Sequence, residues 1–131
     1  MTPEAREHLL ERAYAAFNAA DSEARGDIWS EDIVFRPVDG WPGPQEYHGH
    51  DGLWQFRKDW FGTWDDAVVE AGRPEHLGDE QALIAVCARG CAQGTEFELP
   101  FWQLARFRGE CIAWVGNFLD EDEARAEARS A

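Results

Sequence analysis

The stretch that decides the fold is residues 81–108, QALIAVCARGCAQGTEFELPFWQLARFR. It predicts two long strands, Gln81 to Ala92 and Glu96 to Arg108, joined by a short hairpin turn at Gly94. The continuously apolar run from Ala82 to Ala88 is typical of a strand that is covered on both faces. This stretch therefore predicts an antiparallel sheet with material packed on each side.

Further strands extend the pattern outward from this pair. Ala67 to Leu77 precedes it and Cys111 to Leu119 follows it, with turns at Gly78-Asp79 and Gly109. Nearer the N-terminus, Ile33 to Arg36 has the composition of a short strand, which the proline and glycine residues that follow must end.

Helical periodicity dominates the first half of the chain instead. Thr2, Pro3 and Glu4 form a helix start, and apolar residues then recur at helical spacing up to Ala20. Three more helices are predicted: a short one from Asp21-Ser22 to about Trp29, one from Asp51 to Trp64, and a polar tail helix from Asp120 to Ala131. Helices first and antiparallel strands afterwards predict an α+β fold, with the sheet packed against helices on one face.

The strand from Glu96 to Arg108 is apolar on both faces in places. One face carries Phe97, Phe101 and alternate residues, and the other carries Trp102 and Leu104. Only one face can meet the chain's own N-terminal helices, so the Trp102 and Leu104 face is a candidate homodimer interface. The alternative is that the polar tail helix covers it.

Composition excludes several classes of partner. The 131 residues include 26 acidic and 12 basic ones, a formal net charge of −14. Nucleic acids and anionic membrane surfaces are both bound through basic residues, so neither is an expected partner. The length is that of one domain, and we expect a single domain over residues 1–131.

Nothing in the sequence indicates a membrane or export. It has no apolar run of about 18 residues, and its N-terminus lacks a basic segment followed by an apolar one. We therefore expect a cytoplasmic protein. Cys87, Cys91 and Cys111 are an odd number of cysteines, which favours buried thiols in a reducing compartment.

An ordered set of short motifs runs through nearly the whole chain. The set is YAAFNAAD (14–21), WSEDIVF (29–35), FRPVDGWPGP (35–44), YHGHDG (47–52), ELPF (98–101), Gly109 and NFLDE (117–121). Together with the element order, it resembles the SnoaL-like family of the nuclear-transport-factor-two-like (ketosteroid-isomerase-like) superfamily. The resemblance implies a cone, in which a strongly bent, mostly antiparallel sheet wraps around the N-terminal helices. It also implies a pocket at the wide end and a homodimer. Relatives include isomerases, cyclases, dehydratases, hydrolases and non-catalytic binding domains, so the fold does not set the function.

The resemblance also suggests three catalytic positions. Tyr14 falls where ketosteroid isomerases hold an oxyanion with a tyrosine, Arg36 falls on their base position, and Gln103 falls on their protonated acid. A guanidinium is always protonated and cannot accept a proton, so steroid-type proton transfer through this set is not expected. If Arg36 points into the cone, it suits a carboxylate, enolate or phenolate ligand. The other readings are that Arg36 pairs with Asp32 or Asp39, or is exposed.

Aromatic residues supply most of the predicted ligand contacts. Trp41, on the proline- and glycine-rich loop, is placed to cover the mouth of the cone, and the resemblance places the other aromatic residues along its wall. The predicted ligand-binding set is Tyr14, Phe17, Arg36, Trp41, Phe56, Trp60, Phe101, Gln103, Trp114 and Phe118. A flat, apolar or aromatic ligand fits such a set.

No cofactor or metal is expected. His48 and His50 with Glu46 are similar to part of a cupin metal motif, but they lie in a loop that leads into a helix, and the only later histidine is His76. The sequence has no glycine-rich phosphate loop and no serine-nucleophile motif.

Three functions follow as hypotheses. The first is a small-molecule-binding domain with Tyr14, Arg36 and Gln103 as its polar contacts. The second is an isomerase, cyclase or dehydratase, whose base would be Asp32, Asp39 or a water molecule. The third is a non-catalytic homodimerisation module that acts through the Trp102 face.

Overall fold

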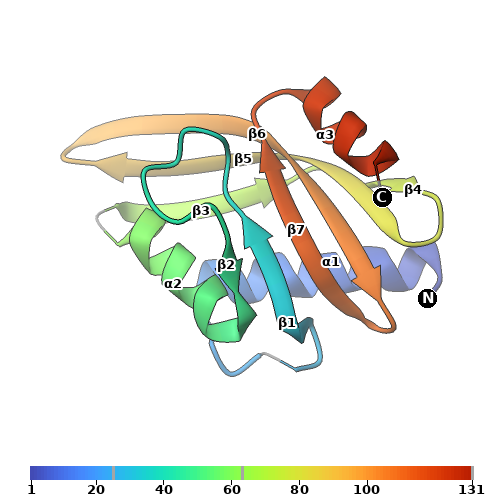
Figure 1. Ribbon diagram of the computed structural model, residues 1–131. Coiled ribbons are helices and arrows are strands. Elements are labelled where there is room, and N and C mark those ends of the chain that lie inside the picture. Colours follow the sequence, from blue (N-terminus) through green and yellow to red (C-terminus); the bar gives the residue numbers. More distant parts are fainter. Residues whose placement is uncertain (25, 63, 131) are drawn as a thin grey trace.

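The computed structural model describes residues 1–24, 26–62 and 64–130. In these residues, three helices and a seven-stranded open sheet form an α+β fold, as predicted (Figure 1). The helices are α1 (Pro3–Ala19), α2 (Gly49–Phe61) and α3 (Glu121–Arg129). The strands are β1 (Trp29–Arg36), β2 (Tyr47–His48), β3 (Asp65–Ala71), β4 (Glu75–Leu77), β5 (Gln81–Ala92), β6 (Thr95–Arg108) and β7 (Cys111–Phe118).

The strands form one mixed sheet in the order β2-β1-β7-β6-β5-β3, with β4 paired to β5. All neighbours are antiparallel except β1 and β7, which run parallel. The β5–β6 hairpin turns at Gln93 and Gly94, whose φ angles of 52° and 80° suit the tight turn that matches the twist of the strands. The predicted central hairpin is therefore confirmed.

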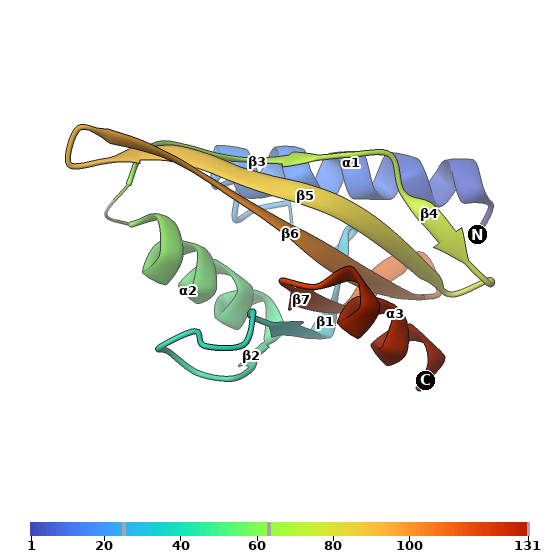
Figure 2. The same cartoon turned by 90° about the horizontal axis from the view of Figure 1, so that it is seen from above.

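The helices cover both faces of the sheet. Figure 2 shows α1 and α3 on opposite sides of the β5–β6 pair. Helix α1 begins as predicted, because the Thr2 side chain accepts a hydrogen bond from the Ala5 N–H over 3.1 Å and Pro3 opens the first turn. Its Phe17 ring packs edge-on against Phe61 of α2, with centroids 5.6 Å apart. We call the sheet face that meets α1 and α2 the inner face, and the one that meets α3 the outer face.

Hydrogen bonds tie the end of α1 to its neighbours. The Asn18 side chain bonds both backbone groups of Val69 on β3, accepting from its N–H over 2.8 Å and donating to its carbonyl over 2.9 Å. Arg57 of α2 donates to the carbonyls of Phe17 and Asn18. The bond to Asn18 satisfies a carbonyl near the helix end, where carbonyl groups lack partners within the helix, and these contacts together fix the position of α1 over the sheet.

The predicted homodimer face is partly occupied. Leu83, Leu104 and Phe118 form an outer apolar cluster with Ala124 of α3, and Leu104 is 0% exposed. Leu104 therefore cannot take part in a subunit contact while α3 stays in place, because the tail helix buries it. Trp102 packs beside this cluster and keeps part of its surface accessible. The alternative reading, in which the tail helix covers the face, holds for Leu104.

Two predicted elements differ from the structure. Residues 21–24 and 26–28 form turns instead of a short helix, and Asp21 bonds the Glu23 N–H through its side chain. Such local bonds compete with helix formation, and Trp29 instead starts β1 by pairing with Ile112. The strand predicted from Ala67 to Leu77 is split into β3 and β4, because Pro74 has no N–H to donate to the sheet. Among the described residues, no helix is long and apolar enough to cross a membrane.

Candidate functional site

A chain of neutral polar side chains crosses the inner face of the sheet. The Tyr14 hydroxyl of α1 donates to Gln103 Oε1 of β6. Gln103 Nε2 donates to Asn117 Oδ1 of β7 over 2.9 Å, and Asn117 Nδ2 donates to the backbone carbonyl of Arg36 over 2.8 Å. Gln103 and Asn117 are cross-strand partners in register, which is why their amides meet. Both amides are buried, so these bonds satisfy groups that water does not reach.

The last member of this chain sets the direction of all its hydrogen bonds. A backbone carbonyl can only accept, so the group of Asn117 that faces the Arg36 carbonyl must be its NH₂. The Asn117 oxygen then accepts from Gln103, and the Gln103 oxygen accepts from Tyr14. The Tyr14 hydroxyl therefore donates its proton to Gln103. A further partner can bind only to the lone pairs of the Tyr14 oxygen.

Tyr14 remains a neutral phenol at physiological pH. Burial raises its pKa well above the ordinary value of 10.0, because a phenolate would lose its hydration there. The neutral hydroxyl keeps the proton that the bond to Gln103 requires.

Two small cavities lie along this polar chain. The first, of about 50 Å³, is lined by Tyr14 and Gln103 among apolar side chains. Its remaining lining is Leu10, Ala13, Phe17, Trp29, Phe35, Leu53, Trp60, Val69, Ala105, Ile112 and Val115. The second, of about 80 Å³, is lined by Asn117 and by Pro37, Val38, Trp41, Phe56, Trp60, Leu99 and Phe101.

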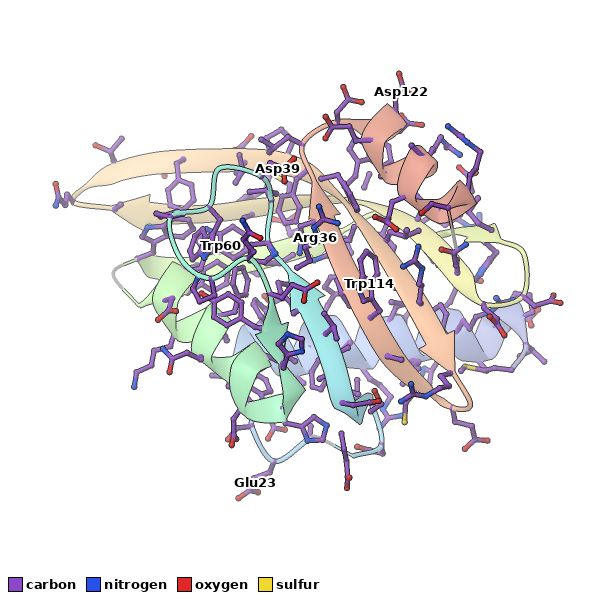
Figure 3. All side chains as sticks on the ribbon, in the orientation of Figure 1. Glu23, Arg36, Asp39, Trp60, Trp114 and Asp122 are labelled. Atoms are coloured by element: carbon purple, nitrogen blue, oxygen red, sulfur yellow. The ribbon has the colours of Figure 1, made fainter. Side chains whose placement is uncertain are left out.

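Trp60 lines both cavities and so stands between them. Its ring lies against four other aromatic rings, with centroids 4.8 Å from Phe61, 5.4 Å from Phe56, 5.6 Å from Trp64 and 5.8 Å from Phe101. Figure 3 shows Trp60 beside the β1–β2 loop. Among the described residues, Trp60 is thus the one that the two linings share.

Trp41 closes the second cavity from the side of the β1–β2 loop. Its indole N–H donates to the Tyr47 hydroxyl over 3.2 Å, and that hydroxyl donates to Asp59 Oδ2 of α2 over 3.0 Å. Burial and the nearby Asp59 carboxylate raise the pKa of Tyr47, although the bond from Trp41 lowers it. Trp41 also lines a surface crevice on the outside of the loop, so it forms the wall between that crevice and the second cavity.

Comparison with family models decides the family. A model described as a SnoaL-like domain matches residues 10–115. The chain belongs to the SnoaL-like family. No curated protein matches it significantly.

Solved structures confirm the fold of this SnoaL-like chain. It is similar to a ketosteroid isomerase-like protein from Catenulispora acidiphila in complex with trimethylamine, with a TM-score of 0.72, 19% identity, and coverage of 98% of this chain and 95% of that one. It also resembles a protein named TerC, co-crystallised with polyporic acid, with a TM-score of 0.74, 16% identity, and coverage of 95% and 97%. A third similar structure is a candidate polyketide cyclase from Xanthomonas campestris, with a TM-score of 0.69, 18% identity, and coverage of 94% and 96%. Identities this low show a shared fold alone.

The structure brings together part of the predicted ligand-binding set. Tyr14, Phe17, Trp60 and Gln103 line the first cavity of this SnoaL-like domain. Trp41, Phe56, Trp60 and Phe101 line the second. Seven of the ten predicted residues therefore lie around two adjoining spaces.

The structure places the other three predicted residues on the outer face. Arg36 points away from Tyr14 and Gln103, and its Nη1 pairs with Glu127 of α3 over 3.4 Å. Strand alternation explains this placement, because Ile33 and Phe35 of β1 face the core and Arg36 must face the other way. Trp114, labelled in Figure 3, and Phe118 alternate in the same sense on β7. Trp114 lies under Arg106, and Phe118 lies in the cluster covered by α3. The reading in which Arg36 points into the cone is therefore wrong; Arg36 pairs with a carboxylate, but that of Glu127 and not that of Asp32 or Asp39.

The proposed alternative bases also lie away from the cavities. Asp32 is exposed and pairs with Arg108, whose hydrogen bond lowers the pKa of Asp32. Asp39 lines the crevice outside the β1–β2 loop. Of the described residues, no carboxylate or imidazole lines either cavity. The histidines of the loop have separate partners: His48 pairs with Glu46, and His50 bonds the Trp29 carbonyl.

Asn117 is the polar site residue that the sequence analysis missed. Its signal was available, because Ala113, Val115 and Asn117 occupy alternate positions of the last predicted strand and Asn117 is the polar one. Only the register of β6 and β7, which places Asn117 opposite Gln103, gives it a function in the polar chain.

Proposed function

We propose that this SnoaL-like domain binds a small, flat, apolar molecule in the space around Trp60. The observation that carries the proposal is the pair of adjoining aromatic-lined cavities with one polar chain along their wall. Small apolar sites with a few placed polar groups are the usual form of ligand pockets. The complexes of similar structures with trimethylamine and polyporic acid support small-molecule binding in this fold.

Binding requires side chains to move. The cavities of about 50 Å³ and about 80 Å³ are each smaller than the cavity of about 150 Å³ that holds a benzene molecule in another protein. Displacement of Trp60 would join them and add the volume of its own ring. In this proposal the ligand selects a conformation in which Trp60 has moved, and its contacts are Tyr14, Phe17, Trp41, Phe56, Phe101, Gln103 and Asn117.

A thermal-shift screen tests this proposal. Neutral and carboxylated aromatic compounds are added to wild type, to Trp60→Ala and to the outer-face control Trp114→Ala. We expect neutral compounds to raise the Tm of wild type by several degrees near saturation, because a ligand at about 100 times its Kd stabilises a protein by about 2.7 kcal/mol. The ranking of compounds should change in Trp60→Ala and stay the same in Trp114→Ala. If no compound shifts either wild type or Trp60→Ala, the binding proposal is wrong.

An isomerase, cyclase or dehydratase activity is the second candidate, favoured by the name of the Xanthomonas campestris structure. Two features of the site count against it. The Tyr14 proton is already donated to Gln103, so Tyr14 is not free to hold an oxyanion. A general base must also reach the substrate, and the described lining of the cavities offers none. Binding without catalysis therefore agrees better with the geometry.

A homodimer through the uncovered part of the outer face is a further proposal. Trp102 keeps part of its surface accessible next to the exposed Ala85 and Pro100. Size-exclusion chromatography with light scattering on wild type and Trp102→Glu is the test. A wild-type dimer that becomes a monomer in Trp102→Glu supports the interface, and a dimer in both rejects it. A single domain over residues 1–131 and a cytoplasmic location remain proposals from the sequence.

A further inference from the structure

The described linings of the two cavities carry no charged side chain. Among the described residues that line them, none is an aspartate, glutamate, lysine, arginine or histidine. Arg36, the cation expected inside, is held on the outer face by Glu127. A ligand with a net charge would lose its hydration without gaining a counter-charge, which is costly in an apolar site. The lining therefore favours a neutral ligand.

The polar chain presents its free hydrogen-bonding groups in a fixed order. At the Tyr14 end the available group is an oxygen lone pair, since the proton is used and no described donor reaches this oxygen. Gln103 and Asn117 each retain one amide N–H after making the bonds described above. Tyr14 and Gln103 line the first cavity, and Asn117 lines the second. The first cavity thus offers the Tyr14 oxygen as an acceptor with the Gln103 N–H beside it, and the second offers the Asn117 N–H as a donor.

The partition between the cavities is a single apolar ring. Trp60 makes its contacts with other aromatic rings, and no hydrogen bond of its indole N–H to a described residue holds it in place. Rotation of this side chain would open one elongated space that runs from Tyr14 to Asn117. The length of that space depends on the size of residue 60.

We infer that the ligand is a neutral, flat ring compound that carries a hydroxyl or N–H at the Tyr14 end and a carbonyl at the Asn117 end, and that Trp60 limits its length. This inference rests on the proposed binding function. It adds the polarity of the ligand, which follows from the direction of the hydrogen bonds that the Arg36 carbonyl imposes. It also makes Trp60 a specificity-determining residue.

Matched one-ring probes test the polarity. The probes are para-hydroxyacetophenone, with a hydroxyl and a carbonyl at opposite ends, phenol, acetophenone and benzoate. Affinities come from NMR titrations that follow the Trp indole signals and the side-chain amides of Gln103 and Asn117. We expect para-hydroxyacetophenone to bind about five- to tenfold more tightly than phenol or acetophenone, since each added hydrogen bond contributes a factor of that order. Benzoate should bind most weakly.

A variant separates the Tyr14 end from the rest. In Tyr14→Phe combined with Gln103→Leu, the advantage of para-hydroxyacetophenone over acetophenone should shrink to within about twofold, because both the Tyr14 oxygen and the Gln103 oxygen that Tyr14→Phe alone would free are gone. The wild-type ranking needs no variant, so loss of stability in the double variant leaves the polarity testable.

A second variant tests the length limit. Trp60→Ala should bind the two-ring analogue, a naphthalene with hydroxyl and acetyl groups at opposite ends, about tenfold more tightly relative to para-hydroxyacetophenone than wild type does. The matched control is Trp64→Ala, because Trp64 packs on Trp60 at 5.6 Å but lines neither cavity. In that control the ratio of the two affinities should stay at the wild-type value.

The outcomes distinguish a failure of the ligand polarity or the length limit from a failure of small-molecule binding itself. If benzoate binds best, if phenol and para-hydroxyacetophenone bind equally, or if Trp60→Ala leaves the two-ring to one-ring ratio unchanged, the inference is wrong while small-molecule binding stands. If no probe binds to wild type or to Trp60→Ala, the proposed function fails and the inference fails with it.

Discussion

The inner and outer faces of the sheet use the same three strands for opposite purposes. On the inner face, Gln103 and Asn117 continue a neutral chain of hydrogen bonds from Tyr14. On the outer face, Arg106 lies over Trp114 at 4.3 Å and donates to Glu127 over 3.1 Å, while Arg36 pairs with the same carboxylate. Neighbouring residues of one strand thus contribute neutral side chains to the hydrogen bonds of the inner face and charged side chains to the contact with α3 on the outer face. Strand alternation therefore places Arg36 of β1 and Arg106 of β6 on the outer face, beside α3.

Truncating a side chain of the outer apolar cluster should cause the largest loss of stability. Leu104→Ala leaves a void between the sheet and α3, and we expect it to lower the free energy of unfolding by about 3 kcal/mol, because Leu104 is 0% exposed. Urea denaturation monitored by circular dichroism measures the change. A loss below about 1 kcal/mol would show that α3 does not pack on Leu104 in solution. The exposed Leu119→Ala is the control, with an expected change within about 0.5 kcal/mol.

Breaking the inner polar chain should cause the next largest loss of stability. Gln103→Leu removes the middle amide and leaves the Tyr14 hydroxyl and the Asn117 oxygen without their partners. Stranded buried polar groups cost about 1–3 kcal/mol, so we expect a loss of about 2 kcal/mol in the same urea experiment. Tyr14→Phe combined with Gln103→Leu should recover part of that loss, because one stranded group is removed with its partner. A purely additive double variant would contradict the chain.

Raising the pH should lower the free energy of unfolding through Tyr14 on the inner face. Burial raises the pKa of Tyr14 above 10.0 in the folded state, so this group stabilises the fold fully below pH 10. As the pH rises above that value, the unfolded state loses the phenol proton first, and the contribution falls by about 1.4 kcal/mol per pH unit until Tyr14 also ionises in the folded state. The free energy of unfolding of wild type and Tyr14→Phe, measured between pH 9 and pH 11, gives the difference. Parallel curves would mean that Tyr14 is not buried as described.

Lowering the pH should remove a stabilising contribution of Glu127 on the outer face, and this effect should be the smallest of the four. Burial raises the pKa of Glu127, but the hydrogen bonds from Arg106 and Ser130 and the charges of Arg106 and Arg36 outweigh it, so the net pKa is lowered from 4.5. The contribution of Glu127 is present above that value and is lost as the pH falls through the lowered pKa. Glu127→Gln should cost about 1 kcal/mol near neutral pH and nothing at the acid end. A difference from wild type that does not shrink in acid would assign the effect to packing instead of charge.

The central sheet could be predicted because its signals are local. The hairpin at Gly94 needs only a turn residue between two strand-forming runs, and Thr2 with Pro3 marks a helix start by local chemistry. The failures involve competition or contact at a distance. A turn forms at Asp21 in place of the predicted short helix, because the Asp21 side chain accepts a hydrogen bond from the nearby Glu23 N–H. The position of α3 was left open because the sequence of a polar helix does not indicate which face of a sheet it packs against.

The site shows the same division. Aromatic residues such as Phe56 and Trp60 could be assigned to the interior from the fold that the sequence resembles. The side of the sheet that Arg36 faces required the alternation of β1, in which Ile33 and Phe35 take the inner positions. Asn117 became a site residue only through its register with Gln103.

The sequence by itself determined the family, the α+β class, the central hairpin and an aromatic interior, because apolar periodicity and turn residues act over a few positions along the chain. Only the tertiary structure decided that no described residue lining the two cavities is charged, that the hydrogen bonds along them run from Tyr14 to the Arg36 carbonyl, and that Trp60 is common to both linings. These properties depend on which strand faces meet which helices. That depends on pairing and packing between residues far apart in the chain, about which a single sequence carries little information.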